Sequence, residues 1–104
     1  MFKIAAFGDK ESVGIFSSVG IDTFVFTDSL KAGEKINEVS KDYGIIFVTE
    51  TIGRDIKHVI DKYRDLVTPA IILIPSSKGS SGDALMQIRE SVIKAVGTDI
   101  IFDG

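Results

Sequence analysis

The stretch that decides the fold is Gly44-Ile45-Ile46-Phe47-Val48-Thr49. Four large apolar residues follow one another here without a polar interruption. Such a run is typical of a strand that is covered on both faces, as strands of a parallel sheet are. Two further runs of strand length, residues 2–7 and 70–74, are also mostly apolar. We therefore expect a sheet with helices packed on both of its faces.

Amphipathic segments separate these strands, and each carries apolar residues at helical spacing. The segments begin near Asp9, Asp28, Thr51 and Asp83. Asp9 can cap the first helix, and Asp28 or Ser29 the second. The second of them should place Leu30, Ile36 and Val39 on its inner side. A further strand is expected at Asp22–Thr27, where phenylalanines alternate with other residues.

Strands that alternate with helices along a chain predict parallel strands joined by right-handed crossovers. We expect an α/β three-layer sandwich, with a four-stranded parallel sheet in the order 2-1-3-4 flanked by helices. This is the flavodoxin-like or receiver-like arrangement with one strand fewer. Residues 1–97 are expected to form a single domain, and residues 98–104 a short apolar tail.

Composition excludes several classes of function. The formal charge is −3 and the lysines and arginines are scattered, so the basic footprint of a nucleic-acid-binding protein is missing. There is no cysteine, and His58 is the only histidine, which argues against thiol chemistry and a histidine metal site. No apolar run is long enough for a membrane span, and no signal peptide is recognised. We expect a cytoplasmic protein without a cofactor.

A ligand site is conceivable where the strand order reverses. Gly8, Asp9, Thr49 and Glu50 should lie there, and the two acids could hold Mg²⁺. This alternative corresponds to a divergent receiver-like signalling domain with a Mg²⁺ or phosphate site at Asp9 and Glu50. The competing interpretation is that Asp9 caps a helix and Glu50 is solvated. A receiver would also need an aspartate after the third strand and a fifth strand, and neither is found.

The Ser/Gly-rich segment 76–83 offers a second alternative, a small enzyme that cradles a phosphate in this loop. Its glycines lack the spacing of a P-loop, and it follows the last strand instead of the first. A surface connection is the simpler interpretation.

Two apolar segments are candidates for contact with a partner. The first is the expected edge strand, although phenylalanine is usually buried, so the core is the simpler place for its two phenylalanines. The second is the tail, whose three adjacent apolar residues cannot all face one surface of the domain. The candidate contact residues of the two segments are Thr23, Phe24, Val25, Phe26, Ile100, Ile101 and Phe102.

The order and spacing of four segments resemble one known family, the F subunit of the V/A-type ATPases, over nearly the whole chain. These segments are Lys3-Ile4 leading into Gly8-Asp9-Lys10-Glu11-Ser12-Val13, then Tyr43-Gly44-Ile45-Ile46-Phe47-Val48-Thr49-Glu50, then Thr68-Pro69-Ala70-Ile71-Ile72-Leu73-Ile74-Pro75-Ser76, and finally Lys94-Ala95-Val96-Gly97.

The resemblance implies a non-catalytic component of the central rotor that is bound to the coiled-coil D subunit. It also implies that ATP is hydrolysed or made elsewhere, in a head built from the A and B subunits, while the rotor carries torque to the membrane ring. The C-terminal segment of the family is linked to regulation, and here that segment is short.

Overall fold

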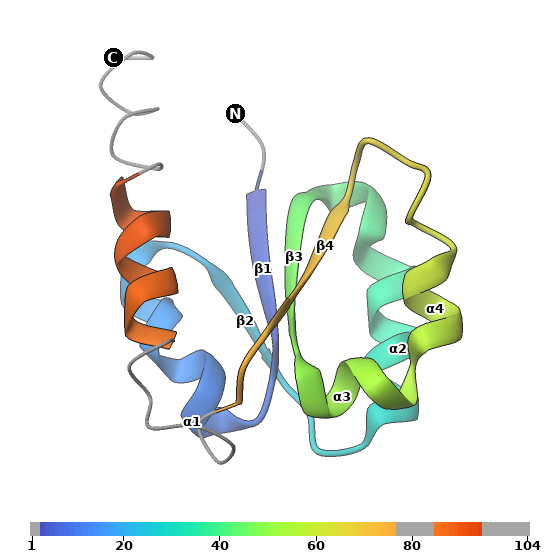
Figure 1. Ribbon diagram of the computed structural model, residues 1–104, viewed down its shortest axis with the longest axis horizontal. Coiled ribbons are helices and arrows are strands. Elements are labelled where there is room, and N and C mark those ends of the chain that lie inside the picture. Colours follow the sequence, from blue (N-terminus) through green and yellow to red (C-terminus); the bar gives the residue numbers. More distant parts are fainter. Residues whose placement is uncertain (1–2, 77–84, 95–104) are drawn as a thin grey trace.

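The computed structural model describes residues 3–76 and 85–94 of the chain. Its centre is a parallel sheet in the order β2-β1-β3-β4. The strands are β1 (Lys3–Gly8), β2 (Asp22–Val25), β3 (Tyr43–Thr49) and β4 (Ala70–Ile74). Helices lie on both sides of the sheet, as Figure 1 shows. The predicted α/β architecture and the predicted strand order are confirmed.

One face of the sheet is covered by α1 (Lys10–Val13), by the 3-10 helix η1 (Gly14–Val19) and by the helical residues 85–94. The carboxylate of Asp9 caps α1 by accepting a hydrogen bond from the Ser12 amide. The core on this face includes Phe16 and Phe47, whose rings stack with centroids 5.9 Å apart. We expected a continuous α-helix here, but it tightens into a 3-10 helix after one turn. Gly20, with φ of 84°, ends it.

Arg89 fastens the helical residues 85–94 to this layer. Its Nε donates to the carbonyl oxygen of Ile15 over 2.7 Å, and its Nη2 donates to Ser18 Oγ over 3.2 Å. Leu85 and Val92 on the same helix are buried. The helix is therefore held by apolar burial and by two hydrogen bonds from the Arg89 guanidinium.

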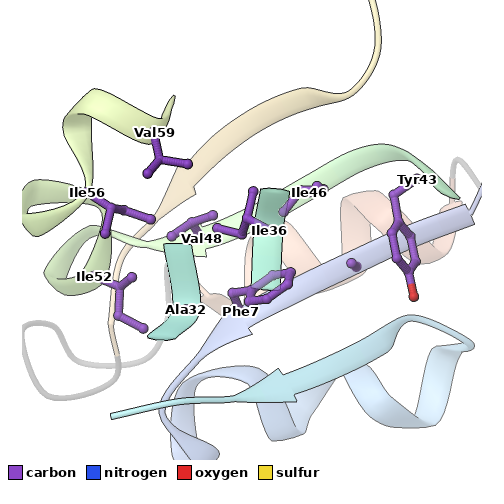
Figure 2. Packing of buried hydrophobic residues seen from close by; sticks show 10 residues of the cluster. Phe7, Ala32, Ile36, Tyr43, Ile46, Val48, Ile52, Ile56 and Val59 are labelled. Carbon is purple, nitrogen blue, oxygen red and sulfur yellow. The ribbon is translucent and has the colours of Figure 1, made fainter. Parts of the chain in front are cut away.

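The other face is covered by α2 (Ser29–Val39), the 3-10 helix η2 (Ser40–Asp42), α3 (Glu50–Asp55) and α4 (Lys57–Asp61). Among the described residues, the larger of the two core clusters lies here. Figure 2 shows how side chains from β1 and β3 meet those of the three α-helices. Its labelled members are Phe7, Ala32, Ile36, Tyr43, Ile46, Val48, Ile52, Ile56 and Val59.

The prediction for the inner side of α2 was wrong at Leu30, which is 67% exposed. The buried residues of this helix are Ala32, Gly33 and Ile36. At 3.6 residues per turn, Leu30 lies about 120° around the helix from Ile36, so it points away from the sheet.

The single helix expected from Thr51 onward is instead two short helices that meet at Ile56. This residue leaves helical geometry, with φ of −118° and ψ of 32°, and is fully buried. Gly33 of α2 gives the junction room, because a Cβ there would lie 3.3 Å from methyl groups of Ile56 and Val59. The break is thus set by packing between helices, which local periodicity does not encode.

Candidate functional site

The expected switch-point crevice exists at the carboxyl ends of β1 and β3. It encloses about 220 Å³ and is lined by polar residues from several elements, including Asp9, Thr49, Asp55 and Ser76. The carboxylate of Asp9 is already engaged. One oxygen accepts from Ser12 Oγ over 2.7 Å, and the other accepts from the Ser12 amide over 3.2 Å. Asp9 therefore caps the helix, as the competing interpretation of the sequence had it.

Glu50, the other acid expected at this point, is the exposed first residue of α3 and is not among the described residues that line the crevice. Within residues 3–76 and 85–94, no group of three or more histidine, aspartate or glutamate side chains could hold a metal ion. The arrangement gives the receiver-like alternative no support from geometry.

Thr49 is the unusual residue of this crevice. It is 1% exposed, and its hydroxyl has no hydrogen-bond partner among the described residues. The side chain is held against Gly8: a Cβ on Gly8 would overlap the Thr49 methyl group and lie 3.1 Å from its hydroxyl. The site therefore depends on glycine at position 8.

The candidate contact residues of the edge strand β2 lie on two opposite sides of the strand. Phe24 stacks on Phe7 with centroids 4.6 Å apart, and Phe26 stacks on the same ring at 6.0 Å. Both are half-buried against the core. Val25, by contrast, is 53% exposed, and Thr23 is half-buried. β2 itself ends at Val25, two residues earlier than expected, although the amide of Phe26 still donates to the carbonyl of Gly8.

The remaining sequence candidates lie outside the described residues. These are Ile100, Ile101 and Phe102 of the tail, together with residues 77–83 of the Ser/Gly segment. The partner-contact role of the tail stays a prediction.

Sequence reasoning missed a larger apolar surface at the opposite edge of the sheet. Leu66 is 54% exposed and Val67 is 91% exposed in the connection that precedes β4. On β4 itself, Ile72 is 43% exposed and Leu73 is 47% exposed. We call these four residues the β4 surface. The signal was present in the sequence, because the predicted order 2-1-3-4 makes the fully apolar run 70–74 an edge strand.

In the part of the chain that the structure describes, no helix has the length and apolar character needed to cross a bilayer.

Large apolar side chains are exposed at both edges of the sheet. Exposed apolar patches of this kind mark protein contacts, so the fold is typical of a protein that works within an assembly.

Comparison with known proteins identifies the assembly. The family model for the ATP synthase (F/14-kDa) subunit matches residues 4–92. The chain is 45% identical over 102 residues to the F subunit of the V-type ATP synthase of Fusobacterium nucleatum, covering 97% of each chain. It is 39% identical over 100 residues to that of Clostridium botulinum, covering 95% of this chain and 97% of the relative. It is 29% identical over 101 residues to the F subunit of the A-type ATP synthase of Methanothermobacter thermautotrophicus, covering 94% and 95% respectively.

The chain therefore belongs to the ATP synthase (F/14-kDa) subunit family. Membership makes it a component of a V/A-type rotary ATPase complex, and an accessory component rather than a catalytic one. The resemblance stated from the sequence is confirmed.

Proposed function

We propose that this chain is part of the central stalk, the rotor, and that it binds the coiled-coil D subunit (the coiled-coil partner). In this position it helps couple ATP hydrolysis or synthesis in the A/B head to ion transport through the membrane ring. It works from the cytoplasmic side, at the periphery of the membrane. The observation that carries the proposal is the family match over residues 4–92, together with apolar side chains exposed at the sheet edges.

The proposed mechanism is docking, so that torque passes through a stiff contact. The architecture suits this task because both faces of the sheet are packed against helices. Close-packed interiors have low compressibility and transmit strain. A domain of this kind would move with its partner as one body.

We include two elements from the sequence analysis as contacts in the stalk. One is the β2 edge, where Val25 and Thr23 lie on the side opposite the core phenylalanines. The other is the apolar tail with Ile100, Ile101 and Phe102.

The test is co-purification with the coiled-coil partner encoded by the same genome. We expect the tagged chain to retain this partner through gel filtration, and to alter the ATPase rate of an A/B head assembled with it. If the purified proteins do not associate at micromolar concentration, the proposal is wrong.

A second measurement separates the proposal from the receiver-like alternative. The pure chain is incubated with Mg²⁺ and either ATP or acetyl phosphate. We expect no turnover and no acyl phosphate above the level of a Glu50→Ala control. Clear turnover that the substitution removes would contradict the rotor proposal.

A further inference from the structure

The β4 surface lies at one edge of the sheet, and its two strand residues reach both faces. Leu73 pairs in register with Val48, and Ile72 with Phe47, on the neighbouring strand β3. Successive residues of a strand point to opposite faces. Leu73 therefore extends the face that α3 and α4 cover, and Ile72 extends the face of η1 and residues 85–94. Figure 1 shows β4 running between these two helical layers.

Within residues 3–76 and 85–94, this edge lacks the protection that free edge strands carry. Soluble proteins usually guard an exposed edge with lysine, with an inward charge or with a bulge. Residues 70–74 contain no charged residue, and β4 pairs with β3 without a register shift. Prolines stand only outside the strand, at positions 69 and 75. An unguarded edge of this kind indicates that another protein covers it in the assembled state.

A shallow groove runs along the edge between β4 and the residues that follow α4. It encloses about 400 Å³, and its described lining is apolar or aromatic apart from Arg64. Leu66, Leu73 and Tyr63 are among its walls. Arg64 pairs with Asp61 over 2.9 Å, but the Arg64 side chain is 70% exposed. The guanidinium is therefore available to an acidic group on an occupant.

We propose that the β4 surface is the docking site for one helix of the coiled-coil partner. The helix would lay an apolar stripe into the groove and place an acidic side chain next to Arg64. This inference rests on the proposed function and adds to it the surface through which binding occurs.

The area of the β4 surface suits such an occupant. The four side chains together expose a few hundred Å² of apolar surface, the size at which patches on monomers are often functional. A stable interface buries about 800 Å² on each partner, with an apolar centre and a polar rim. The β4 surface supplies the centre, and Arg64 belongs to the rim.

A helix fits this surface better than an added strand does. A strand paired with β4 would lie in the plane of the sheet and would leave Leu66 and Val67, which precede the strand, uncovered. A helix with its side chains is about 10 Å wide, and it can touch the connection and the groove together.

The first experiment measures the affinity of the purified coiled-coil partner for the full chain and its variants. Val67→Asp and Leu66→Asp change exposed residues outside the helices and strands, so thermal melts should show that both variants fold. Each should weaken binding roughly tenfold or more, as expected for the centre of an interface. Leu30→Asp on α2 is the matched control, since Leu30 is at least as exposed as Leu66. It should bind within about twofold of the wild type.

Two outcomes separate the inference from the proposed function. If wild-type protein fails to bind the coiled-coil partner, the proposed function and the inference both fail. If wild-type protein binds and Val67→Asp and Leu66→Asp bind equally well, only the inference is overturned. It is also overturned if Leu30→Asp weakens binding as much as they do.

The second experiment identifies the kind of occupant. The chain has no cysteine, so Val67→Cys provides a single thiol. The complex is formed with partner variants that each carry one cysteine, placed in turn along each helix of the coiled-coil partner. Disulfide formation with Val67→Cys is then measured after oxidation. Disulfides at positions three or four apart would support a docked helix. Disulfides at every second position would indicate strand pairing and would overturn the inference.

Discussion

The hydroxyl of Tyr43 donates a 2.6 Å hydrogen bond to the carboxylate of Asp22. Tyr43 opens β3 and Asp22 opens β2, so the bond joins two strands that flank β1 and are not neighbours. The Tyr43 ring also meets Phe24 edge-on, with centroids 6.0 Å apart. Burial, the hydrogen bond to Asp22 and the charges of Asp22 and Asp42, in this order of size, raise the pKa of Tyr43 from 10.0 to about 12.

This raised pKa predicts a specific loss of stability in alkali. The pKa of Tyr43 is higher in the folded than in the unfolded protein. The contribution of Tyr43 to stability is therefore complete below about pH 10 and is lost as the pH rises toward about 12. Tyr43→Phe should lower the free energy of unfolding by about 1 kcal/mol near neutral pH, because it removes the hydrogen bond to Asp22. The loss stays small because the exposed Asp22 is re-solvated. It should also flatten the decline of stability in alkali. Urea unfolding of both proteins at several pH values measures this, and parallel declines would contradict the prediction.

Gly8→Ala should destabilise the fold through contact with a buried side chain. The new Cβ would overlap the methyl group of the buried Thr49, so the threonine side chain or the backbone would have to shift. Overpacking of this kind costs about 1–3 kcal/mol. Gly14→Ala is the control, because a Cβ at that helical position meets nothing within 4 Å. It should be neutral or stabilise by about 0.5–1 kcal/mol. Equal melting temperatures for the two variants would refute the argument.

Thr49→Val should stabilise the protein. The substitution keeps the shape of the side chain and removes a buried hydroxyl that has no partner among the described residues. An unsatisfied polar group costs about 1–3 kcal/mol, so a gain of about 1 kcal/mol is expected. Thr49→Ser, which keeps the hydroxyl and loses the methyl group, should destabilise instead. Chemical denaturation of the three proteins decides this, and a destabilised Thr49→Val would mean that the hydroxyl has a partner in solution.

The sequence predicted those parts of the fold that depend on local pattern. The continuous apolar run at 44–49 identified a strand covered on both faces, and Asp9 marked the start of the first helical segment. The break at Ile56 and the outward direction of Leu30 could not be predicted in this way. Both depend on how α2, α3 and α4 fit against one another, and apolar spacing along one segment does not contain that information.

The candidate surfaces show a different limit. Hydropathy cannot distinguish a strand buried inside a domain from an edge strand that a partner covers, because both need apolar residues. The run 70–74 was therefore interpreted as an ordinary strand. Phe24 and Phe26 pose the reverse problem: their aromatic character suggested a partner contact, while the structure packs both rings on Phe7. Strand order combined with hydropathy would have pointed to the β4 surface.

Deletion of residues 98–104 tests the tail as a contact element. Burying an isoleucine or phenylalanine contributes about 1.5–3 kcal/mol, so Ile100, Ile101 and Phe102 are expected to have a docking site. We expect the truncation to cost at most a few kcal/mol of stability. It should weaken assembly with the coiled-coil partner, or change ATPase stimulation, by more than that loss explains. If the truncated protein melts much lower yet binds normally where it is folded, the tail only supports the domain.

Thr23→Lys and Val25→Lys test the β2 edge as a contact in the stalk. Lysine is a natural guard of edge strands, so both variants should fold. Each should weaken association with the coiled-coil partner or with the assembled stalk.

The distance between the two sheet edges makes this prediction sharper. Four strands spaced about 4.8 Å apart place β2 about 14 Å from β4, and one helix about 10 Å wide that runs along the strands cannot cover both. A β2 contact must therefore involve a different element from the helix on the β4 surface. The effects of Val25→Lys and Val67→Asp on assembly should then add in the double variant, as they do for independent sites. Normal assembly of Thr23→Lys and Val25→Lys would leave the β4 surface as the contacting edge.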